Sequence, residues 1–223
     1  MSEAIFSMVI ALDLCSEARK DGIVSNCHDS EIVRSLIELT DSHTGEVVSA
    51  KLFTSLRFDC DYVLWVTARN VNIIPAIRSA LEASGYLRSF PYYFLSLYED
   101  SPYTKEGITL EDTLRKGSLN YLVAYPMSKS NDWYLLPFDE RKRIMAQHIG
   151  MAVSHRENRN IRSYTTYSFG ISDQEFVVIY EVDSLVAWSH VTSKLREAEA
   201  RKWITKETPI LVGSRCWEFI SEV

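Results

Sequence analysis

The sequence lacks several features that mark specialised classes of protein. Its 223 residues include only eight glycines and six prolines, too few for a disordered or collagen-like chain. Its longest uncharged apolar stretches, such as Phe176–Tyr180, are far shorter than a membrane span, and the first twelve residues hold Glu3 and lack the basic flank of a secretory signal. We therefore expect a globular, cytoplasmic protein with no membrane span.

Cysteine and positive charge are also scarce. The four cysteines, at positions 15, 27, 60 and 216, are too far apart for a zinc or redox motif and are expected to be free cytosolic thiols. The net charge of −6 argues against nucleic-acid binding. Residues 1–110 carry 9 Lys+Arg and 15 Asp+Glu, whereas residues 111–223 carry 15 of each. The second half is therefore the better host for an anionic ligand.

What the sequence does contain is a faint internal repeat. Residues 58–66 (FDCDYVLWV) and 171–180 (ISDQEFVVIY) are each an acidic turn followed by a run that is apolar on both faces, typical of a strand buried against helices. Each half reads strand–helix–strand–strand–helix, followed by a closing strand. The predicted ranges are 5–12, 29–39, 51–57, 58–66, 72–84 and 92–98 in the first half, and 119–125, 139–155, 161–169, 171–180, 184–203 and 208–213 in the second.

This order of elements predicts an α+β fold made of two fused ferredoxin-like repeats with antiparallel sheets. If the two sheets meet, both apolar faces are buried and the exposed sheet edges are removed. We expect residues 1–100 to form the first repeat and residues 119–223 the second. Residues 101–118, with Pro102 and Gly107, are the expected linker.

The predicted helix at 139–155 carries the main candidate for a metal ligand. At 100° per residue, His148 shares one narrow arc with Ile144, Met151 and His155, so it is expected to point inward. Two interpretations stay open: a core histidine with one hydrogen bond, or a neutral imidazole that binds a metal or haem iron. His155, on the same face, is the fallback ligand.

The predicted helix at 184–203 supplies a possible partner for that histidine. Glu199 lies near the middle of its apolar stripe, where a carboxylate needs pairing. It is expected either to hydrogen-bond the second ring nitrogen of His148, as carboxylates do around ligating histidines, or to pair locally with Arg196 or Arg201.

Two more candidates precede the helix at 139–155. Tyr125 lies on a predicted strand, and a tyrosine beside a redox cofactor can donate an electron and a proton. Lys129 follows in a loop, where it can pair with a ligand carboxylate. The alternatives are a half-buried strand aromatic and a solvated loop charge.

Taken in order, these residues resemble the chlorite dismutase family, which includes the coproheme decarboxylases. The matching segments are Tyr125–Ser130, Trp133-Tyr134, Glu140-Arg141 with Met145 and His148, Tyr167–Gly170, Glu175–Val178, Leu195–Ala200, and Thr208–Ile210 with Gly213. They span essentially the whole second half. The resemblance implies a dimeric α/β-barrel type of fold, haem b or iron coproporphyrin in the second repeat, and a homo-oligomer, most often a pentamer.

The resemblance also implies roles for the matched residues. His148 corresponds to the axial iron ligand, and Glu199 to the carboxylate that orients it. Tyr125 corresponds to the tyrosine that decarboxylases oxidise to a radical, and Lys129 to a lysine that contacts a porphyrin carboxylate. The other residues implied to bind the porphyrin are Met127, Trp133, Ser163 and Arg196.

One departure from the family's pattern bears on the activity. True chlorite dismutases place an arginine on the distal side of the haem, and Gram-positive decarboxylases a glutamine. The corresponding positions here are Ile161 or Ser163, and Arg162 between them points to the opposite face of its strand. Chlorite decomposition needs a fixed cation to confine hypochlorite, so this departure disfavours that activity.

The leading hypothesis is therefore the peroxide-dependent oxidative decarboxylation of iron coproporphyrin (coproheme) in haem biosynthesis. Tyr125 and Lys129 are its expected catalytic residues. Three alternatives stay open: a chlorite dismutase or weak haem peroxidase, a non-catalytic haem carrier or sensor, and a non-haem α+β protein in which His148 is only a core residue.

Overall fold

The structure, a computed structural model, describes residues 4–20, 27, 30–99 and 110–221. Within these residues the strands are β1 (Ile5–Leu14), β2 (Val47–Ser55), β3 (Tyr62–Ala68), β4 (Leu87–Tyr98), β5 (Tyr121–Lys129), β6 (Ile161–Tyr167), β7 (Phe176–Val182), β8 (Ile204–Lys206) and β9 (Leu211–Ile220). The helices are α1 (Ser16–Lys20), α2 (Glu31–Ser42), α3 (Ile73–Ala83), α4 (Leu110–Leu114), α5 (Asn131–Leu135), α6 (Phe138–Ser154) and α7 (Leu185–Leu195), with 3-10 turns η2 (Asn158–Asn160) and η3 (Glu199–Trp203).

Eight of the strands close into a ring of antiparallel pairs. The order is β7–β6–β4–β1–β3–β2–β9–β5, and β5 pairs back with β7. The sets β4–β1–β3–β2 and β9–β5–β7–β6 each have the strand order of a ferredoxin-like unit, and they join through β2–β9 and β4–β6. The predicted fold class is therefore confirmed.

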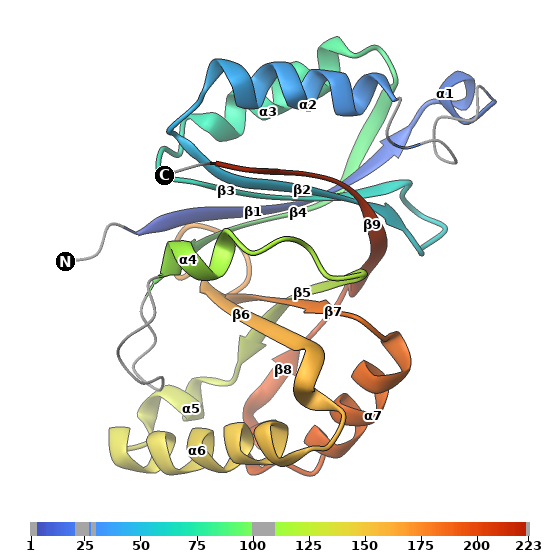
Figure 1. The fold of residues 1–223 in the computed structure, drawn as a ribbon. Helices are drawn as coiled ribbons and strands as arrows, with labels where there is room; N and C mark the ends of the chain where they lie inside the picture. Colours follow the sequence, from blue (N-terminus) through green and yellow to red (C-terminus); the bar gives the residue numbers. More distant parts are fainter. Residues whose placement is uncertain (1–3, 21–26, 28–29, 100–109, 222–223) are drawn as a thin grey trace.

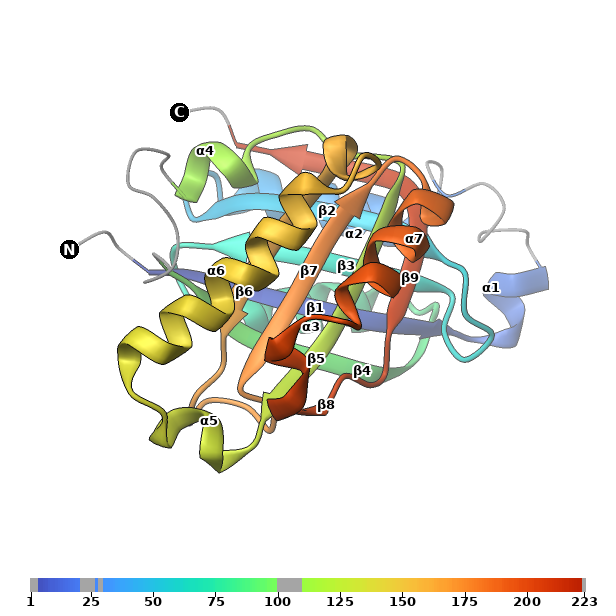
Figure 2. The same ribbon diagram turned by 90° about the horizontal axis from the view of Figure 1, so that it is seen from below.

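The longer helices cover the outside of this ring in two layers. Figure 1 shows α2 and α3 over the first unit, α6 and α7 over the second, and the two sheets facing each other between them. Figure 2 shows that α6 and α7 flank β7 on the outer face of the second unit. No helix in the described ranges is long and apolar enough to cross a membrane.

The outer layer of the first unit is filled with side chains. Alternate residues of a strand point to opposite faces, so Tyr62, Leu64 and Val66 of β3 join the core that packs against α2 and α3. Val63 and Trp65 join the core between the two sheets. All of β3 is buried because both faces are covered, as its continuous apolar sequence predicts.

The outer layer of the second unit is packed differently. Val177 and Ile179 of β7 fill the interior between the sheets, like their counterparts in β3. Phe176, Val178 and Tyr180, on the other face, line a cavity beneath α6 and α7. The same architecture therefore encloses a packed core in one unit and an internal space in the other.

A buried ion pair connects the two units across the interior. Lys51 of β2 donates from Nζ to Oε1 of Glu181 of β7 at 3.1 Å, and neither side chain is exposed. Tyr164 of β6 donates its hydroxyl to Oε2 of Glu181 at 2.7 Å. Burial lowers the pKa of Lys51, although the charge of Glu181 opposes this shift. The pair is satisfied by hydrogen bonds, which a buried charge requires.

Several predicted elements differ in extent. The strand expected at 119–125 is β5, which continues to Lys129, so the prediction that Lys129 lies in a loop is wrong. The helix expected at 184–203 ends at Leu195, and Ala198 adopts extended backbone angles before η3 begins at Glu199. The closing strand expected at 208–213 is β9, which runs to Ile220 and pairs with β2 of the first unit. The repeat boundaries stay a prediction: residues 101–109 of the expected linker lie outside the described residues, and α4 occupies part of the rest.

The prediction of four free thiols is wrong for two of the cysteines. Cys27 and Cys216 form a disulfide, with Cα atoms 6.0 Å apart, whereas Cys15 and Cys60 are free. The bonded cysteines are 189 residues apart in sequence. They meet because β9 crosses to the first unit, so local cysteine spacing carries no sign of the pairing.

Candidate functional site

A cavity of about 730 Å³ lies between the outer face of β5, β6 and β7 and the helices α6 and α7. This volume is typical of small-molecule sites, which span roughly 300–1,000 Å³. Alternate residues of the three strands form its floor because they share one face of the sheet. They are Tyr125, Met127 and Lys129 of β5, Ile161, Ser163, Thr165 and Tyr167 of β6, and Phe176, Val178 and Tyr180 of β7.

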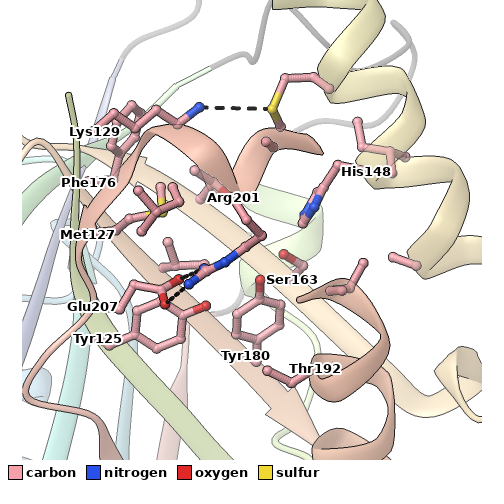
Figure 3. Close-up of a pocket in the computed structure, with 18 of the residues that line it drawn as sticks. Tyr125, Met127, Lys129, His148, Ser163, Phe176, Tyr180, Thr192, Arg201 and Glu207 are labelled. Atoms are coloured by element: carbon pink, nitrogen blue, oxygen red, sulfur yellow. Dashed lines mark hydrogen bonds and ion pairs between the residues drawn. The ribbon is translucent and has the colours of Figure 1, made fainter. Parts of the chain in front are cut away.

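His148 reaches into this cavity from α6. Figure 3 shows its ring pointing away from the helix toward the middle of the space. Within the described residues, its Nδ1 is buried and has no hydrogen-bond partner. Burial lowers the pKa of His148, and the positive charges of Lys129 and Arg201 lower it further. The ring is therefore neutral at pH 7, the form in which histidine binds metals.

Tyr125 lies across the cavity from His148, beside Tyr180 (Figure 3). The two tyrosine ring centres are 6.2 Å apart, with an interplanar angle of 27°. Burial raises the pKa of Tyr125 well above its ordinary value, and the neighbouring Tyr180 and the charge of Glu207 raise it further. Tyr125 is thus a neutral phenol that keeps its proton at physiological pH.

Lys129 occupies another part of the cavity wall, at the end of β5. Its Nζ lies 3.5 Å from the centre of the Trp133 ring and 4.0 Å from Sδ of Met145. Burial lowers the pKa of Lys129 to about 8; the charge of Glu175 opposes this shift and that of Arg141 adds to it. The lysine is therefore a cation held against an aromatic face, close to its titration point.

Arg196, the predicted porphyrin-binding arginine, also lines the cavity but is not free. Its Nη1 donates to Oε2 of Glu207 at 2.7 Å, and Arg201 binds the same carboxylate through both Nη atoms. Burial raises the pKa of Glu207, but the bonds from the two arginines outweigh it and the net pKa is lowered. These three residues form a charged cluster with a net charge of +1.

The β6 wall has the orientation that the sequence predicts. Ile161 and Ser163 line the cavity. Arg162 points to the opposite face, where its Nη1 donates to the carbonyl of Gly117 at 2.7 Å and lies 3.7 Å from Oε2 of Glu181. On this strand the cavity therefore meets the apolar Ile161 and the hydroxyl-bearing side chains of Ser163, Thr165 and Tyr167, and no cation.

Glu199 does not orient His148 in this structure. It lies in η3, outside the cavity lining, and its carboxylate binds Arg143 at 3.0 Å and Lys202 at 3.4 Å. The expected inward position depended on a continuous helix, and the break at Ala198 turns this side chain outward. The fallback ligand His155 caps α6 outside the cavity lining, where its Nδ1 accepts from the Glu157 amide.

Buried polar atoms without partners are concentrated in the cavity. In the described part of the chain there are four such side-chain atoms, and three belong to residues of the cavity wall: Nε of Arg141, Nδ1 of His148 and Oγ1 of Thr192. Buried polar groups are nearly always hydrogen-bonded, so three orphaned atoms in the wall of one cavity make its lining unusual.

Sequence reasoning did not predict several cavity residues as candidates, among them Arg141, Tyr180, Thr192, Arg201 and Glu207. Tyr180 could have been found, because it alternates with Val178 along β7. Thr192 lies on the α7 face toward the sheet. Arg201 and Glu207 lie in short irregular segments, where no periodicity indicates which side chains meet.

Comparisons with known proteins agree on one family. The family model described as chlorite dismutase matches residues 29–216. The coproheme decarboxylase of Mycolicibacterium smegmatis is 29% identical over 163 residues, which cover 72% of this chain and 69% of that protein.

Solved structures extend the likeness to almost the whole chain. A structure provisionally named chlorite dismutase TA0507 is 42% identical, with a TM-score of 0.82, and 95% of this chain matches 94% of it. A chlorite dismutase variant from Candidatus Nitrospira defluvii has a TM-score of 0.77 at 15% identity, covering 96% and 92% of the two chains. A haem-binding protein from Thermus thermophilus has a TM-score of 0.73 at 19% identity, covering 96% and 91%. The last two establish likeness of fold alone.

Proposed function

This chain belongs to the chlorite dismutase family, and we propose that it is a haem-dependent oxidoreductase that oxidatively decarboxylates iron coproporphyrin. The observation that carries the proposal is the placement of a neutral, unpartnered histidine and a buried neutral tyrosine on facing walls of one cavity. The similarity to a coproheme decarboxylase supports the choice of substrate.

The cavity residues fit an iron porphyrin. The imidazole of His148 is neutral and lacks a partner at Nδ1, so it would suit the iron as a ligand. Met127, Val178 and Phe176 offer an apolar wall to a flat ring. Lys129 and Arg196 lie at the wall with charges that complement porphyrin carboxylates.

In this proposal His148 would hold the iron, and Lys129, together with Arg196 once a propionate displaces Glu207, would orient the propionates. When bound, the iron porphyrin supplies peroxide-driven oxidation. Tyr125 carries its proton on Oη and loses an electron and that proton together, so that it relays oxidation to a propionate side chain. For each propionate converted to a vinyl, one carbon dioxide leaves and one hydrogen peroxide is reduced to two waters.

The experiment combines the protein with iron coproporphyrin and hydrogen peroxide and measures the porphyrin mass. We expect loss of two carboxyl groups in the wild type and in the control variant Tyr121→Phe, which changes a β5 tyrosine outside the cavity lining. Tyr125→Phe should bind the porphyrin but lose at least 100-fold in rate, and His148→Ala should lose the spectral shift of bound iron. A wild type that binds the porphyrin and removes no carboxyl group is a carrier, and the proposal is then wrong.

Chlorite is the second substrate to measure. The absence of a cation on the cavity face of β6, between Ile161 and Tyr167, predicts little or no oxygen release from chlorite.

We also propose that the protein forms a homopentamer and lies in the cytoplasm. Light scattering of the purified protein tests the first proposal, and fractionation of cells tests the second.

A further inference from the structure

The carboxylate of Glu207 is hydrogen-bonded to two arginines that could otherwise bind a ligand carboxylate. Its Oε2 accepts from Nη1 of Arg196 and from Nη2 of Arg201, both at 2.7 Å, and its Oε1 accepts from Nη1 of Arg201. The side chain of Glu207 is 16% exposed and that of Arg196 is 49% exposed, so the cluster lies where the cavity meets solvent. Guanidinium groups bind a ligand carboxylate through the same pattern of paired donors.

The cations of the cavity are therefore not equally available. Lys129 rests its Nζ on the Trp133 ring, and neither Lys129 nor Arg141 forms an ion pair with a carboxylate of the described residues, so both have a positive charge to offer a ligand. Arg196 and Arg201 already share Glu207. A ligand carboxylate that binds Lys129 forms new bonds without breaking any. A ligand carboxylate that binds Arg196 and Arg201 must first replace their existing bonds to Glu207.

We propose that Glu207 takes the place of a ligand carboxylate in the ligand-free protein and is the specificity-determining residue for the number of carboxylates on a porphyrin. A carboxylate that reaches Arg196 and Arg201 displaces Glu207, whose side chain turns to the adjacent solvent. Because the lost bonds offset the gained ones, the wild type benefits little from that extra carboxylate. The inference rests on the proposed function and adds a determinant of substrate choice to it.

The test compares two metal-free porphyrins by fluorescence titration, so neither iron nor turnover enters the readout. Coproporphyrin carries four propionates, and mesoporphyrin carries two, with ethyl groups in the other two places. Replacing Glu207→Gln should raise the preference for coproporphyrin over mesoporphyrin by about tenfold, equivalent to about 1.4 kcal/mol. The matched control Glu197→Gln removes a carboxylate that binds Lys194 outside the cavity lining, and should leave the preference unchanged.

Two further variants keep the test decisive. Glu207→Asp retains the charge but withdraws the carboxylate by one methylene, and should raise the preference about threefold. Adding Arg196→Met to Glu207→Gln should cancel most of the gain. Thermal melting identifies folded variants. If both porphyrins bind the wild type and folded Glu207 variants keep its preference, this inference is wrong and the proposed function stands; if neither porphyrin binds, the proposed function itself fails.

Discussion

The ammonium of Lys129 lies 3.5 Å from the centre of the Trp133 ring, in a wall where burial lowers its pKa from 10.5 to about 8. Trp133 is only 2% exposed and packs with Ile144 and Ala200, so the aromatic surface beneath the lysine is fixed. A cation this close to neutrality can change charge within the working pH range of most enzymes.

Binding of metal-free coproporphyrin should weaken as pH rises from 7 to 9. Lys129 is charged below its pKa of about 8 and neutral above it, so its attraction for a carboxylate is lost across that range. We expect a fall of up to about tenfold in affinity, because a charge-assisted bond becomes a neutral one. Lys129→Met should bind more weakly at pH 7 and show a flat profile; an unchanged slope in this variant would contradict the assignment.

The same lysine affects stability with the opposite sign. The pKa of Lys129 is about 8 in the folded chain and 10.5 in the unfolded chain. Between these two pH values the unfolded chain therefore binds more protons than the folded chain. Because of this difference, the contribution of Lys129 to the free energy of unfolding rises with pH in that range. Urea midpoints of the wild type and Lys129→Met, measured across that range, should converge as the lysine becomes neutral in both states.

Replacing His148→Ala should change the stability of the protein without porphyrin by no more than about 1 kcal/mol. The variant loses packing contacts, which lowers the free energy of unfolding. It also removes the unpartnered buried Nδ1 of His148, whose burial costs about 1–3 kcal/mol, so the two effects offset each other. The control is Ile144→Ala, one turn earlier and fully buried, which should cost about 2–5 kcal/mol. Urea denaturation measures both. A large loss in His148→Ala would favour a structural core histidine.

Tyr125 and Tyr180 should remain protonated when ordinary tyrosines ionise. Burial is the first cause of the raised pKa in both, and the charge of Glu207 adds to it. Ultraviolet titration to pH 11 should therefore give the same tyrosinate signal for the wild type and Tyr125→Phe. A signal smaller by one tyrosine in the variant would show that Tyr125 ionises normally.

Lys51→Met should destabilise the protein by about 3 kcal/mol, since it leaves the buried carboxylate of Glu181 without its ammonium partner, with only the Tyr164 hydroxyl and the more distant Arg162 beside it. Changing both residues to methionine should recover part of that loss, because no unpaired charge then remains. Urea denaturation of Lys51→Met, Glu181→Met and the double variant measures the coupling between the two residues. If the loss of stability in the double variant equalled the sum of the two single losses, the coupling would be contradicted.

The fold and part of the site followed from the sequence for identifiable reasons. Two-residue alternation and the order of elements are local signals, and they were enough to predict two ferredoxin-like units. His148 and Tyr125 were predicted as site residues because helical periodicity and the ordered family motif both point to them, and their chemical roles stay predictions.

Other features depended on backbone geometry that the side-chain pattern does not encode. Glu199 was placed inward by extending helical periodicity through Ala198, where the chain is extended instead. The contact of Arg201 with Glu207 arises between a 3-10 turn and a loop, and the bond between Cys27 and Cys216 joins residues from opposite ends of the chain. Each depends on how non-local segments meet.

The pairing of β2 with β9 has a consequence for synthesis of the protein on the ribosome. β2 ends at Ser55, yet its partner strand begins only at Leu211, in the second unit. Until β9 has been made, the first unit carries an open strand edge, a template for mispairing with other nascent chains. Pairing of strands so far apart in sequence has high contact order, so closure of the ring should be slow compared with formation of the local hairpins.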